Sequence, residues 1–197
     1  HPYTAYDMKP GYGIPGEVTI NSYGFRGKEF SETKAPGTYR IVTLGGSTTY
    51  GIGLEEDGTY PYFLEEILQE RLGTDKIEVL NAGLVSATTA EESGRIENFN
   101  KTSSAIYKRN LSYIIDVAKA RGIPIVLSTF AIDDDAPDWN EHMPEALWAE
   151  GIGQNNAAVR ELTEEYDTPL IEYYEYGLEN KDLFLDSIHM TSEGNEK

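Results

Sequence analysis

Short apolar runs alternate with longer amphipathic stretches along most of the chain. The first clear run, Arg40–Leu44, is rich in β-branched and apolar residues and ends at two glycines, so it predicts a buried strand. The same kind of pattern predicts strands at 77–81, 123–129 and 168–173. A shorter run predicts one more strand at 17–20.

Three stretches have apolar residues at the spacing of an α-helix. The first covers 59–72, with Thr59 placed to cap its start and Gly73 to end it. The second covers 104–121 and the third 152–166. The apolar stripe expected on the second helix consists of Ile106, Leu111, Ile114, Ile115 and Ala118.

This alternation of strands and helices predicts an α/β fold, with a parallel sheet whose two faces are covered by helices. A chain of 197 residues suits one domain, and no internal repeat or linker divides it. Residues 1–38 are rich in Gly, Pro and Tyr and are expected to form an irregular arm packed on the domain. The domain itself is expected to span 39–197.

Charge and composition narrow the classes of partner. The 16 basic and 34 acidic side chains give a formal net charge of −18, a field that repels nucleic acid and anionic membranes. No run approaches the ~18 apolar residues needed to span a bilayer. The chain has no cysteine, which excludes disulfides, zinc–thiolate sites and a cysteine nucleophile. These features fit an exported bacterial protein as well as a cytosolic one.

Ser47 directly follows the predicted strand at 40–44, after Gly45 and Gly46. Sites in parallel α/β sheets form at the carboxyl ends of the strands, so this serine stands where chemistry is expected. The glycines permit a tight turn and a close approach of the backbone to a bound group. By itself, the pattern also suits an ordinary strand-to-loop turn. It matches neither the G-x-S-x-G elbow nor a phosphate-binding loop, since no lysine follows.

A serine hydroxyl needs a base, because it is a poor nucleophile while protonated. Of the 3 histidines, His1 is terminal and His142 lies in a loop with proline, which leaves His189 as the best candidate. Asp186 stands three residues earlier, so both can share a tight turn in which the carboxylate fixes the imidazole tautomer. By themselves, these two residues also suit a surface turn.

A serine after the first strand and an Asp-x-x-His after the last resemble the pattern of the SGNH/GDSL hydrolase superfamily. Residues 41–49 look like its first block, with Gly46 in place of the usual Asp, and residues 79–83 resemble its second. The resemblance implies a flavodoxin-like, three-layer α/β/α sandwich with a mainly parallel sheet. It implies a triad and an oxyanion hole, formed by Ser47, Asp186 and His189 and by the N–H groups of Ser47 and Gly83.

One part of the family pattern is missing. The third block, Gly-x-Asn-Asp, supplies an asparagine donor to the oxyanion, and no such motif exists in this chain. Loss of a central strand would leave unpaired backbone groups in a parallel sheet. Our hypothesis is that a segment near 92–104 is omitted from the printed sequence, with a real deletion as the alternative. The sequence does not assign the missing role to Asn81 or Asn100.

The resemblance implies hydrolysis of carboxylic esters through an acyl-enzyme, on short-chain acyl or acetyl esters of small molecules or carbohydrates. Two alternatives stay open: an O-acyltransferase of the same fold, and a catalytically inactive binding protein. The expected mechanism needs no metal and no organic cofactor. No nucleic-acid partner and no membrane span are expected, while the substrate-binding residues, the oligomeric state and the compartment stay open.

Residues 21–27 resemble a lead-in found in bacterial members of the superfamily. A structural role is expected for this segment, with Arg26 pairing to a carboxylate, and ligand binding by Arg26 is the alternative.

Two further groups of residues have a structural interpretation. Clustered aspartates are expected to form a solvated loop rather than a calcium site, because their spacing matches no EF-hand loop. Clustered tyrosines are expected to pack, and the two tryptophans suit either loop packing or a substrate subsite. The aspartates are Asp133, Asp134, Asp135 and Asp138, the tyrosines are Tyr173, Tyr174 and Tyr176, and the tryptophans are Trp139 and Trp148.

Overall fold

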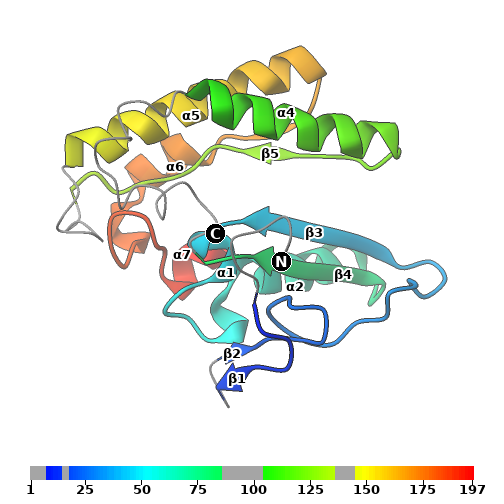
Figure 1. The fold of residues 1–197 in the computed structure, drawn as a ribbon. Helices are drawn as coiled ribbons and strands as arrows, with labels where there is room; N and C mark the ends of the chain where they lie inside the picture. The colour runs from blue at the N-terminus through cyan, green and yellow to red at the C-terminus, as the bar shows by residue number, and fades with distance from the viewer. Residues whose placement is uncertain (1–7, 15–17, 86–103, 136–144) are drawn as a thin grey trace. The chain divides into compact units, whose positions relative to one another are not determined.

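The computed structural model describes four stretches of the chain, which form two compact units (Figure 1). The first unit consists of residues 1–91 and 189–197, and the second consists of residues 92–188. Each contains helices and a two-stranded parallel sheet. The described residues are 8–14, 18–85, 104–135 and 145–197.

The α/β class expected from the sequence is confirmed by these helices and small parallel sheets. The division into an arm over 1–38 and a domain over 39–197 stays a prediction. The segment hypothesised near 92–104 lies, up to residue 103, outside the described residues. Within the described ranges, no helix has both the length and the apolar character needed to cross a membrane.

The parallel pair of β3 (Tyr39–Gly45) and β4 (Ile77–Gly83) forms the centre of the first unit. The two strands align along their whole length. β4 is mostly buried, but in β3 only Thr43 is buried, while Val42 and Leu44 are exposed by 47% and 65%. The predicted burial is therefore wrong for β3, because this strand has one neighbouring strand among the described residues.

Helix α2 (Tyr60–Leu72) packs against β4 and begins and ends where the sequence predicts. Thr59 occupies the N-cap position, but its hydroxyl donates to the Glu56 carbonyl (3.0 Å) instead of capping the helix. Gly73 ends α2 with a φ of 61°, in the left-handed region that favours glycine. The start and stop signals in the sequence therefore located this helix well.

Five short elements complete the first unit. β1 (Gly13–Ile14) and β2 (Val18–Thr19) form an antiparallel pair, which confirms a short strand within 17–20. α1 (Ser47–Tyr50) follows β3, and η1 (Glu56–Gly58) precedes α2. α7 (Ser192–Glu196) packs against both α2 and η1. The sequence predicts only a turn at α1, because four residues are too few to display a helical period.

Two long helices, α4 (Ser104–Ala120) and α5 (Glu145–Tyr166), pack against each other in the second unit, as Figure 1 shows. The predicted stripe on α4 is only partly correct. Ile115 is fully buried, whereas Ile114 is 45% exposed, because α5 and the strands cover a single side of α4. The side chain of Ile106 lies outside the described residues. The buried core consists of Ile115, Leu127, Val159 and Leu162.

The sheet of the second unit is shorter than predicted. β5 (Leu127–Ser128) and β6 (Leu170–Ile171) pair in parallel, inside the two ranges expected for strands. Tyr173 begins a helix instead, α6 (Tyr173–Glu179), which η3 (Lys181–Leu183) follows. An apolar run does not show where strand pairing ends, because pairing depends on the neighbouring strand as well as on hydrophobicity.

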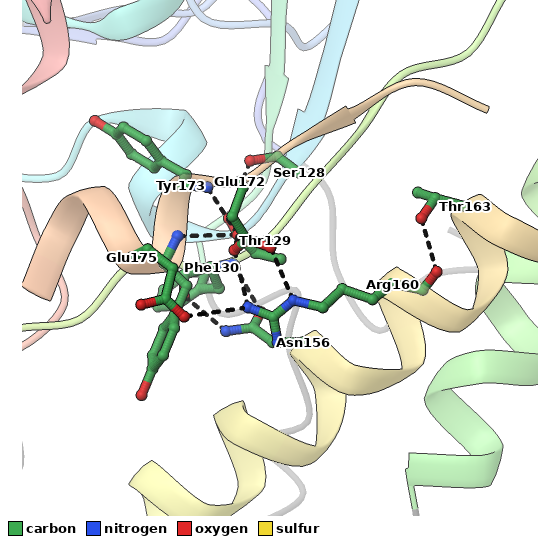
Figure 2. A network of polar contacts seen from close by, with 10 residues as sticks. Ser128, Thr129, Phe130, Asn156, Arg160, Thr163, Glu172, Tyr173 and Glu175 are labelled. Atoms are coloured by element: carbon green, nitrogen blue, oxygen red, sulfur yellow. Dashed lines mark hydrogen bonds and ion pairs between the residues drawn. The ribbon is translucent and has the colours of Figure 1, made fainter.

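A polar network joins the ends of β5 and β6 to α5, as Figure 2 shows. The Thr129 hydroxyl donates to the Glu172 carboxylate (2.7 Å) and accepts from the N–H groups of Tyr173 and Tyr174. Glu172 also forms a two-point ion pair with Arg160 of α5, at 2.8 and 2.9 Å. The network therefore fixes the start of α6 relative to α5.

Asn156 of α5 makes a second connection in the same region (Figure 2). Its side chain is 2% exposed and bonds both polar groups of the Phe130 backbone: the Phe130 N–H donates to Oδ1 (2.8 Å), and Nδ2 donates to the Phe130 carbonyl (3.0 Å). Loss of this side chain would leave two backbone groups without these partners.

We expect Asn156→Ala to destabilise the second unit by about 1–3 kcal/mol, because buried polar groups that lose their hydrogen bonds carry a desolvation penalty. Urea unfolding followed by circular dichroism measures the change. Gln154→Ala is the matched control on the same helix, because Gln154 is exposed and its amide donates to Glu150 on the surface. It is expected to change stability by less than about 0.5 kcal/mol. Equal losses in the two variants would contradict the prediction.

Acid is expected to weaken the second unit through Glu172. The Arg160 guanidinium holds the pKa of Glu172 below its ordinary value of 4.5. A carboxylate whose pKa is lowered on folding adds stability above its unfolded pKa, and this stability is lost as the pH falls through the folded pKa. The urea concentration at the midpoint of unfolding should therefore fall as the pH is lowered below about 4.5. The drop should be shallower in Glu172→Gln, and identical acid profiles would count against the idea.

Candidate active site

Ser47 is the first residue of α1 and lies at the carboxyl end of β3. Its Oγ is 3.0 Å from His189 Nε2, which is hydrogen-bond distance. Both residues are half-buried and belong to the first unit, although 142 positions separate them in the sequence. The structure thus brings together the two residues that the sequence proposed as nucleophile and base.

Two glycines allow α1 to lie directly on the strand ends. A Cβ at Gly45 would stand 2.0 Å from Thr49 Oγ1, and a Cβ at Gly83 would stand 2.2 Å from the Tyr50 nitrogen. Real Cβ atoms do not approach other atoms so closely, so a side chain at either position would push α1 away. Since α1 begins with Ser47, these glycines also set where the serine hydroxyl lies.

A short helix holds His189 in the first unit. Thr191 is the N-cap of α7, and its hydroxyl accepts from the Gly194 N–H (3.0 Å). The helix packs on η1, where Gly58 lies so close to Ser192 that a Cβ would be 3.3 Å from the Ser192 hydroxyl. The segment that follows the imidazole is therefore fixed by local capping and by close packing.

Asp186 belongs to the second unit, three residues before His189. Its Oδ1 accepts from the Ile188 N–H (2.9 Å), which makes a local turn. Ser187 is fully buried, and its carbonyl accepts from the Asp133 N–H (3.0 Å). The turn expected from the Asp-x-x-His spacing is present, while the bond from Asp186 to His189 stays a prediction.

The Gly83 N–H donates to Asn81 Oδ1 (3.0 Å). To bind an oxyanion, this amide would have to exchange that partner, so the role assigned to Gly83 stays a prediction. Asn81 is buried, and its Nδ2 donates to the Tyr50 carbonyl (3.4 Å) while its own carbonyl accepts from the Arg26 N–H (3.1 Å). Asn81 therefore links α1, β4 and the N-terminal segment.

Sequence reasoning missed the support that Tyr60 gives to α1. The Tyr60 hydroxyl donates to Thr49 Oγ1 (3.3 Å), and burial raises the pKa of Tyr60. Tyr60 is the first residue of α2, and the sequence carried no usable signal of this contact. A tyrosine at such a position is indistinguishable from ordinary core packing in one sequence.

The acidic loop carries its own counterion. Lys181 pairs with Asp134 and with Asp135 (2.5 Å), and the Lys181 ammonium lowers the pKa of Asp134. Asp134 and Asp135 are exposed, and Asp133 Oδ1 accepts from the Asp135 N–H (2.9 Å). The ion pair accounts for the clustered charge, and Asp138 lies outside the described residues.

The clustered tyrosines pack against each other. The rings of Tyr173 and Tyr176 stack with centroids 5.6 Å apart and an interplanar angle of 7°. Burial raises the pKa of Tyr173 to about 12. Trp139 and the side chain of Trp148 lie outside the described residues, so their two interpretations both stay open.

No protein-family model and no curated protein matches this chain. Several solved structures resemble it. The SGNH-hydrolase family esterase AlinE4 superposes with a TM-score of 0.56 at 25% identity, over 83% of this chain and 92% of that one. The acetyl xylan esterase AlAXEase gives 0.59 at 19% identity, over 80% and 94%. A GDSL-like lipase from Parabacteroides merdae gives 0.61 at 15% identity, over 80% and 90%.

These structures cover most of the chain, and two of their names, an SGNH-hydrolase family esterase and a GDSL-like lipase, refer to one superfamily. The blocks around Ser47 and His189 resemble the sequence pattern of the same superfamily, and the two side chains lie within hydrogen-bond distance. Fold, sequence blocks and geometry agree, and the chain is a member of the SGNH/GDSL hydrolase superfamily.

Proposed function

We propose that this protein is a serine hydrolase that cleaves carboxylic esters through an acyl-enzyme, with short-chain acyl or acetyl esters as substrates. The observation that carries the proposal is the 3.0 Å distance between Ser47 Oγ and His189 Nε2. An imidazole nitrogen at this distance can take the serine proton during attack. The esterases and the acetyl xylan esterase among the similar structures support the choice of substrate class.

In the proposed mechanism, Ser47 Oγ attacks the ester carbonyl while His189 Nε2 takes its proton. Asp186 keeps the imidazole in the reactive tautomer and stabilises its charged form. His189 then protonates the leaving alcohol, and the acyl group remains on Ser47. A water molecule, deprotonated by the same imidazole, attacks the acyl-enzyme, and the acid leaves as Ser47 regains its proton. His189 therefore accepts and returns every proton that moves in the two half-reactions.

The N–H groups of Ser47 and Gly83 are the proposed donors to the oxyanion. Donors aimed at the developing negative charge often supply the largest catalytic contribution, and loss of one typically costs ~10²–10³ in turnover. The Gly83 amide donates to Asn81 Oδ1 in the structure, so it must turn to the oxyanion when substrate binds. We also propose the three-layer α/β/α sandwich for the complete fold, on the support of the two parallel strand pairs.

A catalytically inactive binding protein is the second candidate. Two observations favour it: the Gly83 N–H already has a partner, and the chain lacks the Gly-x-Asn-Asp motif of the family. A fluorophosphonate probe separates the candidates, because only an activated serine reacts with it. Labelling that is lost in Ser47→Ala supports the enzyme, and no labelling of the native chain supports the binding protein.

We expect the purified protein to hydrolyse p-nitrophenyl acetate and butyrate, with a burst of p-nitrophenol that equals the enzyme concentration if deacylation is slow. Ser47→Ala should abolish the burst and steady turnover, because no other group replaces the nucleophile. The matched control is Ser112→Ala, since Ser112 lies on α4 in the other unit, where its hydroxyl donates to the Arg109 carbonyl. A Ser47→Ala variant that keeps full turnover would rule out the covalent mechanism.

Asp186→Asn is expected to lower kcat by about 10⁴, because an amide favours the unreactive tautomer of the histidine. KM should change little. Asp182→Asn, four residues upstream in η3 and exposed, is the control and should leave kcat unchanged. Similar kcat values for the two variants would remove Asp186 from the proposed triad.

A further inference from the structure

The Arg26 side chain is buried at the C-terminal end of the helix that carries Ser47. It is 4% exposed, and its Nη1 donates to the carbonyls of Tyr50 (2.8 Å) and Gly51 (2.7 Å). Its Nη2 donates to the carbonyl of Leu54 (2.6 Å). The guanidinium also lies over the Tyr50 ring, 4.8 Å from its centroid.

The segment 21–27 is shaped to present this side chain. Asn21 Oδ1 accepts from the N–H groups of Tyr23 and Phe25, both at 3.0 Å, and the Asn21 N–H donates to the Phe25 carbonyl (2.8 Å). Gly24 lies inside this turn with a φ of 82°. The Arg26 N–H then donates to Asn81 of β4 (3.1 Å). The backbone of Arg26 is therefore fixed on the strand next to the one that leads to Ser47.

A buried cation is costly unless hydrogen bonds replace its hydration. Arg26 recovers this cost through three charge-assisted bonds to carbonyl oxygens. Burial lowers the pKa of Arg26, but a guanidinium remains protonated at neutral pH. Its planar group donates from two separate nitrogens to carbonyls in three residues, whereas the donors of a lysine ammonium all radiate from one nitrogen.

Two of the three carbonyls lie at the start of the short connection between α1 and η1, and the third lies near its end. Tyr50 and Gly51 end α1, whose first residue is Ser47, and Leu54 immediately precedes the segment that leads into η1. η1 in turn packs against α7, the helix that follows His189. One guanidinium therefore connects α1, which begins with Ser47, to the segment that leads into η1, on which the helix after His189 packs.

We propose that Arg26 is a positioning residue that sets the distance between Ser47 Oγ and His189 Nε2. The inference rests on the proposed function of Ser47 as the nucleophile. Arg26 acts through the carbonyls at the end of α1 and does not bind substrate. A small shift of α1 moves the serine hydroxyl out of line with the imidazole, and misplacement of a reacting group by about 1 Å can cost ~10² in rate.

The test compares Arg26→Lys with a matched control, Arg40→Lys. Arg40 lies in the same unit and bonds the carbonyls of Ser31 (2.7 Å) and Glu32 (3.2 Å) as well as the Glu78 carboxylate (2.8 Å). Its guanidinium also lies 5.1 Å from an aromatic ring, that of Phe30. Arg40 therefore makes the same kinds of contact without touching α1.

With p-nitrophenyl acetate, Arg26→Lys is expected to lower kcat about 10- to 100-fold at nearly unchanged KM, while Arg40→Lys keeps the native kcat. An Arg26→Lys variant with native kcat overturns the inference, and so does an equal loss in Arg40→Lys. If Arg26→Lys does not fold, Tyr50→Leu takes its place, because it removes the ring under the guanidinium and leaves the carbonyls. It should lower kcat several-fold at constant KM, and a native kcat in this variant overturns the inference.

Hydrogen exchange of residues 47–54 gives a readout that does not need activity. Exchange should be faster in Arg26→Lys than in the native chain, and unchanged in Arg40→Lys. Native exchange in Arg26→Lys overturns the inference even in an active enzyme. A native chain that hydrolyses no ester, with exchange altered only by Arg26→Lys, means that the proposed function has failed while the contact of Arg26 with α1 stands.

Discussion

The close contact between α1 and the ends of β3 and β4 is the constraint on which the site depends. It exists because Gly45 and Gly83 have no Cβ, so that the helix backbone can lie directly on both strands. Ser47 begins this helix, and from that position its hydroxyl lies within hydrogen-bond distance of the His189 imidazole. The parallel pairing of β3 and β4 places the two glycines opposite each other, so the surface on which α1 lies depends on the alignment of the two strands.

Three blocks that are separate in the sequence, residues 21–27, 41–49 and 79–83, contact one another in the structure. Asn81 bonds the Gly83 N–H and the Tyr50 carbonyl through its side chain, and the Arg26 N–H through its backbone. A buried asparagine is stable here because these groups satisfy its polar atoms. The segment 21–27, the helix that begins with Ser47, and β4 therefore share one hydrogen-bonded centre.

The sequence was most informative where local chemistry decides the outcome. Gly73 ended α2 as expected, and the pairing of Ser47 with His189 followed from the scarcity of histidine and the position after a strand. The sequence was least informative where contacts with another element of the fold decide how a side chain is placed. The exposure of Ile114 depends on which side α5 covers, and the carbonyl ligands of Arg26 depend on a turn that only the fold creates.

The first unit is discontinuous, since residues 1–91 and 189–197 form it together and the whole second unit is inserted between them. His189 is translated 142 residues after Ser47. During synthesis the serine is therefore present long before its base, and docking of α7 must close a very long loop. Because residues 92–188 are translated between them, Ser47 and His189 can come within hydrogen-bond distance only after the whole second unit has been made.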